Sequence, residues 1–251
     1  MSGAPRACAT AVVLVASFVA GSVPFSQLAA GCFAGVDLRQ VGSGTVSGSG
    51  LYEVAGFGPL AVAGVLEVAK GAAGPLLARL VPGWPSGKRA PGEPRSLTLL
   101  DAAAAGAAIA AHNWSPWLRG AGGRGLSPAL GATPALAPEG TAVLVAGMVA
   151  GRLLRQSGIS TLLATLGLVP VLGVRRGWRG AALGLSICAP VLTKRVLGNH
   201  PLGPRAGSGS QRAEARTSAT ARFFSRLLFD REPGTRDAAA PDGDRSLVAT
   251  S

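Results

Sequence analysis

The segment Ala111–Gly125, with the sequence AHNWSPWLRGAGGRG, has the residue types of a phosphate-binding site. It ends in a run of glycines around Arg124, and His112 lies near its start. Glycine-rich backbone exposes N–H groups that bind phosphate well next to Arg and His side chains. A plain turn at a membrane surface is the alternative interpretation.

A second glycine-rich segment, Gly35–Gly50, has related chemistry. Successive N–H groups in such a loop can point inward and bind an anion. Arg39 adds a positive charge and Ser43 adds a hydroxyl group. The glycine and serine content argues against a helix or a central strand here. A flexible linker is the alternative, although the Val and Leu residues between the glycines are not needed in a linker.

Two charges, Glu67 and Lys70, stand inside the long apolar segment Val54–Leu80. A charged side chain at the centre of a bilayer costs about 2.5–3.5 kcal/mol, so such residues are candidates for function. Residues three apart share a helix face and can form an ion pair. The alternative is that Lys70 reaches the membrane surface and Glu67 only pairs with it.

The composition is typical of a membrane protein. Of the 251 residues, 48% are hydrophobic and only 14% are charged, whereas about a quarter are charged in soluble domains. The net charge of +12 favours anionic lipid headgroups and phosphorylated substrates as partners over nucleic acid, because aromatic residues are only 5%. The three cysteines lie in apolar segments and indicate neither a disulfide framework nor a metal site. We expect no cofactor.

These features predict an all-α fold, a polytopic bundle of about seven transmembrane helices. The first helix contains Gly21-Ser22-Val23-Pro24, which predicts a kink, and a signal peptide is its alternative interpretation. The fourth helix is too short to cross unless it is tilted or half-buried, and Pro138 ends it. The predicted spans are Ala7–Ala30, Val54–Leu80, Leu97–Ala111, Leu126–Leu136, Thr141–Leu154, Ile159–Val174 and Trp178–Leu197.

The number of crossings predicts where the loops lie. Two spans separate Gly35–Gly50 from Ala111–Gly125, and four more lead to Lys194–Asn199, so all three face the same side. Basic residues in the body show no bias between the two sides, and only Arg205 and Arg212 favour a cytosolic C-terminus.

The chain divides into a transmembrane domain at 1–199 and a mostly disordered cytosolic tail at 200–251. Within the tail, Ala221–Asp230 has the pattern of one amphipathic helix on the membrane surface. A transient helix without a partner is the alternative for this segment.

Several pieces, taken in order, resemble the bacterial integral-membrane glycerol-3-phosphate acyltransferases that use acyl phosphate as donor. The resemblance covers roughly residues 7–200. Its pieces are Gly21-Ser22-Val23-Pro24, Asp37-Leu38-Arg39-Gln40-Val41-Gly42-Ser43-Gly44, Glu67-Val68-Ala69-Lys70-Gly71, His112-Asn113-Trp114-Ser115-Pro116 and Gly122-Gly123-Arg124-Gly125.

The resemblance implies transfer of a fatty acyl group from acyl phosphate to the 1-hydroxyl of glycerol 3-phosphate. The product would be lysophosphatidic acid, in phospholipid synthesis at the cytosolic face of the cell membrane. The residues that it implies for catalysis are Ser43, Arg39 and His112. The residues that it implies for phosphate binding are Gly42, Gly44, Thr45, Gly122, Gly123, Arg124, Gly125 and Lys70.

The sequence also departs from the family's pattern. In the first motif Thr45 replaces Asn, Ser47-Gly48-Ser49-Gly50 replaces a second quartet, and Glu53 stands where a basic residue is expected. In the second motif Arg124 replaces Lys and Ser127-Pro128 replaces Ala-Thr. A third motif is barely visible in 193–200. A family member re-purposed to bind a phosphorylated lipid or metabolite is therefore the second hypothesis. A transporter is the third, although no inverted repeat is evident.

Overall fold

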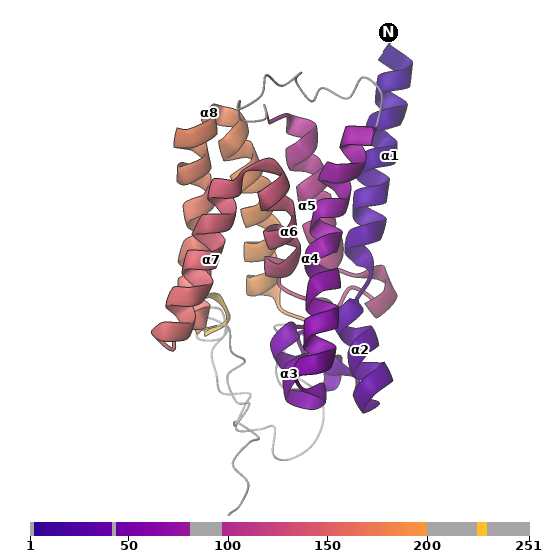
Figure 1. The fold of residues 1–251 in the computed structure, drawn as a ribbon, viewed down its shortest axis with the longest axis vertical. Coiled ribbons are helices and arrows are strands. Elements are labelled where there is room, and N and C mark those ends of the chain that lie inside the picture. Colours follow the sequence, from indigo (N-terminus) through magenta and orange to yellow (C-terminus); the bar gives the residue numbers. More distant parts are fainter. Residues whose placement is uncertain (1–2, 42–43, 81–96, 200–224, 230–251) are drawn as a thin grey trace, which may run out of the picture.

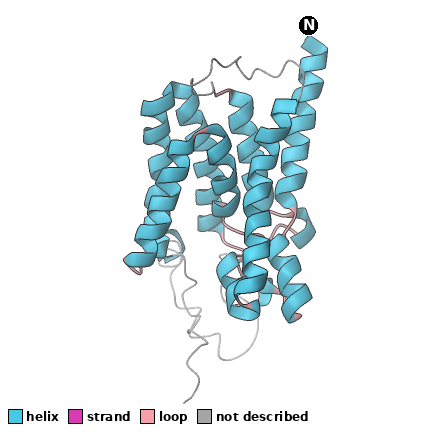
Figure 2. Cartoon of the chain, viewed as in Figure 1, coloured by secondary structure: helices cyan, strands magenta, loops and turns pink. Residues whose placement is uncertain are grey.

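The structure is a computed structural model that describes residues 3–41, 44–80, 97–199 and 225–229. Every regular element among these residues is a helix, which confirms the all-α prediction (Figure 2). The elements are α1 (Gly3–Ser22), α2 (Phe25–Ala34), η1 (Leu38–Gln40), α3 (Gly48–Ala55), α4 (Phe57–Leu80), α5 (Leu99–Asn113), η2 (Pro116–Leu118), α6 (Leu126–Leu136), α7 (Pro138–Leu153), α8 (Ser157–Leu197) and η5 (Ser225–Phe229).

Seven helical segments of the described chain run along the bundle (Figure 1). They are α1 continued by α2, then α4, α5, α6 and α7, and the two arms of α8, which reverses direction at Gly177 (φ 64°). Three described segments are long and apolar enough to cross a membrane, namely Ala7–Ala34, Phe57–Leu80 and Ser157–Leu197. The expected short helix is α6, whose eleven residues pack against α4, α5 and α7 inside the bundle.

Close contacts between backbones hold the helices of the bundle together. A methyl group added to Gly71 of α4 would overlap the carbonyl of Pro128 in α6, and one added to Gly131 would overlap the carbonyl of Val68. A methyl group added to Gly21 of α1 would likewise overlap the backbone of Ala108 in α5. Helices in membranes commonly pack through small residues in this way, because lipid supplies little hydrophobic drive for association.

The first span is broken at Pro24, as the sequence predicts. The last carbonyls of a helix lack hydrogen-bond partners within it. The segment after α5 supplies a partner for one such carbonyl at the end of α1. Ser115 Oγ donates a hydrogen bond to the carbonyl of Ser22 at 2.6 Å. Trp117 Nε1 donates to the hydroxyl oxygen of the same residue at 2.9 Å. The end of α1 is therefore closed by the segment that carries the predicted second motif.

The expectation that Gly35–Gly50 contains no helix is wrong, because α3 begins inside this segment. The Ser47 hydroxyl caps the helix by accepting a hydrogen bond from the N–H of Gly50 at 3.2 Å. Leu51 is fully buried, and capping with burial outweighs the poor helix propensity of glycine. Gly56, at φ 78°, separates α3 from α4, so the second span starts slightly later than expected.

The described part of the tail is η5, which lies against α8. The rest of the predicted helix Ala221–Asp230 lies outside the described residues.

Candidate functional site

The three segments that the sequence places on one side do meet at one end of the bundle (Figure 1). The N–H of Val46, in the first glycine-rich loop, donates to the carbonyl of Gly122 in the second at 3.2 Å. Arg124 Nη2 donates to Thr45 Oγ1 at 3.2 Å. The two loops therefore form one continuous surface, and the prediction from the number of crossings is confirmed.

The end of α8 completes this arrangement. Asn199 Nδ2 donates a hydrogen bond to the carbonyl of Gly44 at 2.8 Å. Lys194 Nζ donates to the carbonyl of Gly120 at 3.2 Å and lies 5.3 Å from the centroid of the Trp114 ring. The segment that barely shows a third motif in the sequence thus contacts both loops.

The second loop has no room for side chains at Gly122, Gly123 and Gly125. A methyl group on Gly122 would overlap the carbonyls of His112 and Asn113, and one on Gly123 would overlap the His112 ring. Gly125 has φ 78°, a conformation that glycine adopts without strain. The chain then enters α6 directly, so the free N–H groups of a helix N-terminus adjoin the loop. This combination is suited to bind an anion.

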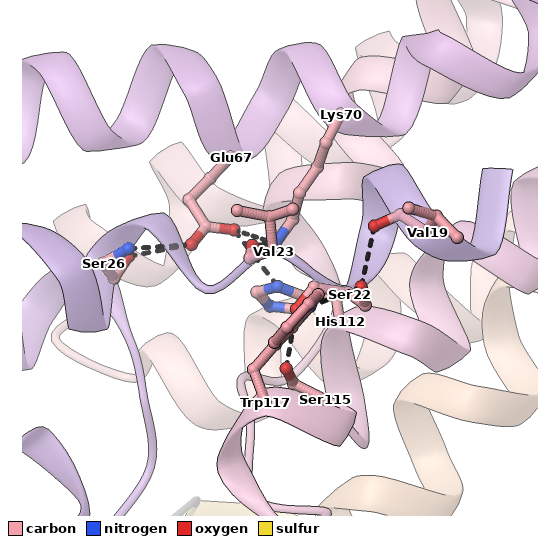
Figure 3. Close-up of polar contacts among 9 residues, drawn as sticks. All are labelled: Val19, Ser22, Val23, Ser26, Glu67, Lys70, His112, Ser115 and Trp117. Carbon is pink, nitrogen blue, oxygen red and sulfur yellow. Dashed lines mark hydrogen bonds and ion pairs between the residues drawn. The ribbon is translucent and has the colours of Figure 1, made fainter. Parts of the chain in front are cut away.

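A buried polar cluster lies beneath the second loop (Figure 3). Glu67 Oε2 is 2.6 Å from Lys70 Nζ and 3.1 Å from His112 Nδ1. Lys70 Nζ also donates to the carbonyl of Val23 at 2.7 Å, and the N–H of Ser26 donates to Glu67 Oε1 at 3.0 Å. These bonds satisfy backbone groups that the break between α1 and α2 leaves open, which a membrane interior would otherwise make costly.

The expected ion pair of Glu67 and Lys70 is therefore confirmed. Both residues are buried, with exposed fractions of 2% and 5%. The alternative in which Lys70 extends to the membrane surface is excluded by its bonds inside the bundle.

The structure brings most of the predicted site residues together. His112 packs against Gly122 and Gly123 of the second loop. From the first loop, Thr45 accepts a hydrogen bond from Arg124, and Gly44 accepts one from Asn199. Lys70 lies in the buried cluster and is linked to His112 through Glu67 Oε2, which contacts both side chains. Gly42 and Ser43 lie outside the described residues.

Arg39 lies outside this contact network and forms a two-pronged pair with Asp37, at 2.6 Å between Nη2 and Oδ2. The Arg39 hydrogen bond holds the pKa of Asp37 below its usual value, and Asp37 raises the pKa of Arg39 in turn. Both side chains are partly exposed, so the pair is screened by solvent.

The sequence marks Glu67, Lys194 and Asn199 but assigns none of them a role in catalysis or phosphate binding. A charge within an apolar span signals Glu67, and the remnant of a third motif signals the other two. Their positions depend on contacts between distant helices, which spacing along the chain does not reveal.

The family model described as glycerol-3-phosphate acyltransferase matches residues 11–199. The chain belongs to this family. The match includes both glycine-rich loops, the buried cluster and Asn199.

Named relatives agree with this assignment. The glycerol-3-phosphate acyltransferase of Synechococcus sp. (strain CC9902) is 33% identical over 185 residues, which is 72% of this chain and 84% of the relative. That of Anaeromyxobacter dehalogenans (strain 2CP-C) is 34% identical over 185 residues, 70% of this chain and 87% of the relative.

The fold of the family is also known from crystal structures. PlsY, an integral membrane glycerol 3-phosphate acyltransferase, in its glycerol 3-phosphate form matches with a TM-score of 0.61 and 20% identity. The match covers 77% of this chain and 96% of that chain. The lysophosphatidic acid form of PlsY matches with a TM-score of 0.59. The chain thus has the fold of an integral-membrane acyltransferase.

Glu53 is the departure from the family that adds a negative charge. It lies on α3 with its side chain exposed. Two cations near the proposed sites, Arg39 and Lys70, form ion pairs with Asp37 and Glu67.

Proposed function

We propose that the protein transfers a fatty acyl group from acyl phosphate to the 1-hydroxyl of glycerol 3-phosphate, at the cytosolic face of the cell membrane. The observation that carries the proposal is the direct bonding of the two glycine-rich loops, through Val46 with Gly122 and Thr45 with Arg124. A reaction between two phosphorylated substrates requires two anion sites side by side, and the paired loops supply them.

The chemistry needs little from the protein beyond position and charge. Acyl phosphate carries a good leaving group, so no protein nucleophile is required, and orientation with charge stabilisation supplies the rate. We assign the acyl-phosphate head to the first loop, including Ser43 and Gly44, with Arg39 at its edge. We assign glycerol 3-phosphate to Arg124, the neighbouring glycines and the N-terminus of α6.

The buried cluster supports the second site from below. Lys70 Nζ is occupied by Glu67 and by the carbonyl of Val23. We therefore assign to Lys70 the task of holding Glu67 in place, with its charge acting on the phosphates only through the cluster. The names of the relatives and the ligand forms of the PlsY crystals support the choice of substrates.

The test uses purified full-length protein in lipid vesicles with acyl phosphate and labelled glycerol 3-phosphate. We expect labelled lysophosphatidic acid and an equal amount of inorganic phosphate. Replacing acyl phosphate by acyl coenzyme A serves as the donor control. Folded protein that yields no product above vesicles without protein would overturn the proposal.

The face of the membrane has its own test. Glycerol 3-phosphate carries charge and does not cross lipid, so inverted membrane vesicles should be active and right-side-out vesicles inactive. Equal activity in both, with both preparations sealed, would contradict a cytosolic site.

A re-purposed family member is the second candidate, and the exposed carboxylate of Glu53 is the observation that favours it. This candidate predicts binding of labelled glycerol 3-phosphate without turnover in the same vesicles. Turnover with acyl phosphate eliminates it.

A further inference from the structure

The turn between α7 and α8 exposes two leucines and two arginines at the end of the bundle where α2 and α3 lie (Figure 1). Leu153 and Leu154 have exposed fractions of 76% and 67%. Arg152 and Arg155, on either side of them, are exposed as well. Among the described residues, neither guanidinium group has a carboxylate partner. These four side chains therefore contribute little to the packing of the bundle.

The backbone of this turn is closely fixed. The N–H of Gln156 donates a hydrogen bond to the carbonyl of Gly151 at 3.0 Å, and that of Leu154 donates to the carbonyl of Ala150 at 2.8 Å. The first of these bonds is typical of a Schellman motif at the end of a helix. A methyl group on Gly151 would overlap the backbone of Ser157, so α7 and α8 meet tightly here. The turn is thus a rigid support for the exposed side chains.

Arg155 occupies the position of this motif where glycine is usual. Its φ is 53°, in the left-handed region, which a β-carbon makes unfavourable. The arginine therefore lowers the stability of the turn relative to glycine, and no ion pair within the described part of the chain compensates for it. A contact outside the chain explains this residue better than folding does.

The length of α7 places the turn at the edge of the lipid. Its 16 residues span about 24 Å at about 1.5 Å each, whereas the hydrocarbon core is about 30 Å thick. At the other end of α7, Glu139 pairs with Arg176, and such a charged pair belongs near the opposite surface of the membrane. The exposed leucines are therefore within reach of acyl chains, and the long arginine side chains can extend to the headgroups.

We propose that the turn at 152–155 binds the headgroup phosphate of an anionic bilayer phospholipid, with Leu153 and Leu154 among its acyl chains. Arginine binds phosphate through a planar group with several donors, and basic residues next to a membrane attract anionic lipids. A zwitterionic lipid offers the same acyl chains without the net negative charge. This site is separate from the two glycine-rich loops, and it does not depend on the proposed reaction.

The test uses full-length protein in phosphatidylcholine vesicles that contain a trace of phosphatidylglycerol with a photoactivatable headgroup. Cross-links are mapped by mass spectrometry of peptides, so the yield at residues 152–155 is read separately from lipid bound elsewhere. We expect this yield to exceed that of photoactivatable phosphatidylcholine. Arg152→Gln and Arg155→Gly should each lower it about fivefold, the scale of one arginine near an anionic lipid surface. Leu153→Ser/Leu154→Ser should lower it as well, because the acyl chains lose their contact.

Stability separates binding from folding. Arg155→Gly should melt at the same or a higher temperature than the unmodified protein in detergent without anionic lipid, because glycine adopts the left-handed conformation without strain. Arg119→Gly is the matched control. Arg119 is the other described arginine with a positive φ, 54°, and it follows Leu118, which is buried. Its replacement should leave the yield at 152–155 unchanged.

Two results for the lipid would overturn the inference, namely equal yields with the two photoactivatable lipids and an unchanged yield in Arg155→Gly. An unchanged yield in Leu153→Ser/Leu154→Ser would also contradict it, because the turn would then lie outside the bilayer. Inorganic phosphate is the last probe. If it removes the cross-links as effectively as unlabelled phosphatidylglycerol at the same concentration, the site binds free phosphate and the lipid assignment is wrong.

Discussion

Asn199 and Gly122 exchange two hydrogen bonds although 77 positions separate them in the chain. The N–H of Gly122 donates to Asn199 Oδ1 at 3.2 Å, and Asn199 Nδ2 donates to the carbonyl of Gly122 at 2.9 Å. The same Nδ2 also donates to the carbonyl of Gly44 at 2.8 Å. One side-chain amide therefore sets the distance between the two glycine-rich loops.

Asn199→Ala removes these three hydrogen bonds, each worth about 0.5–1.5 kcal/mol. We expect KM for both substrates to rise about tenfold, because both loops lose the same support, and Asn199→Asp to be worse because it adds a negative charge beside two phosphates. Steady-state kinetics with each substrate varied in turn measures the effect. Gln156→Ala, at an exposed position before α8, is the control, and unchanged KM values in Asn199→Ala would contradict the structural role.

Arg124→Ala should reduce turnover below about 1% of the unmodified protein, since glycine N–H groups alone do not balance a phosphate dianion. Arg124→Lys should retain intermediate activity, because it keeps the charge but not the planar group that reaches Thr45. Arg119→Ala is the control, an exposed arginine of the same loop. Near-normal turnover in Arg124→Ala would place the phosphate site elsewhere.

The sequence predicts the fold and the meeting of the loops well, because both depend on long apolar runs and the number of crossings. The short α6 is predicted at its observed bounds, since glycine and proline mark its ends. Glu67 and Lys70 are predicted to pair from their spacing on one helix face.

The contacts between helices are what the sequence does not reveal. Nothing in the spacing shows that Glu67 also holds His112, from another helix, or that Asn199 touches Gly44. The helix α3 is missed for a different reason. Its glycines disfavour a helix locally, whereas Ser47 capping and burial of Leu51 favour one in the folded chain.

Gly71→Ala should destabilise the bundle by about 1–3 kcal/mol, because the new methyl group overlaps the carbonyl of Pro128 and forces α4 and α6 apart. Gly64→Ala is a matched control on the same helix, where an added methyl group meets nothing within 4 Å. Alanine favours a helix by about 1 kcal/mol over glycine, so Gly64→Ala should be neutral or stabilising. Thermal unfolding in detergent measures both. Equal melting temperatures for the two variants would show that α4 and α6 do not depend on this close approach.

Gly123→Ala places a methyl group against Nε2 and Cε1 of the His112 ring, and 2.9 Å from the carbonyl oxygen of Val46. The ring is a side chain and gives way more easily than backbone, so the substitution should displace the His112 ring while the loop keeps most of its shape. We expect kcat to fall at least about tenfold, because a small displacement beneath the loop misplaces the reacting groups, and KM for glycerol 3-phosphate to change less. Gly31→Ala, a helical position with nothing within 4 Å of the new methyl group, should leave both constants unchanged. If Gly123→Ala retains the unmodified kcat, the close contact of Gly123 with the His112 ring is not needed for the reaction, and the glycine serves only the packing of the two loops.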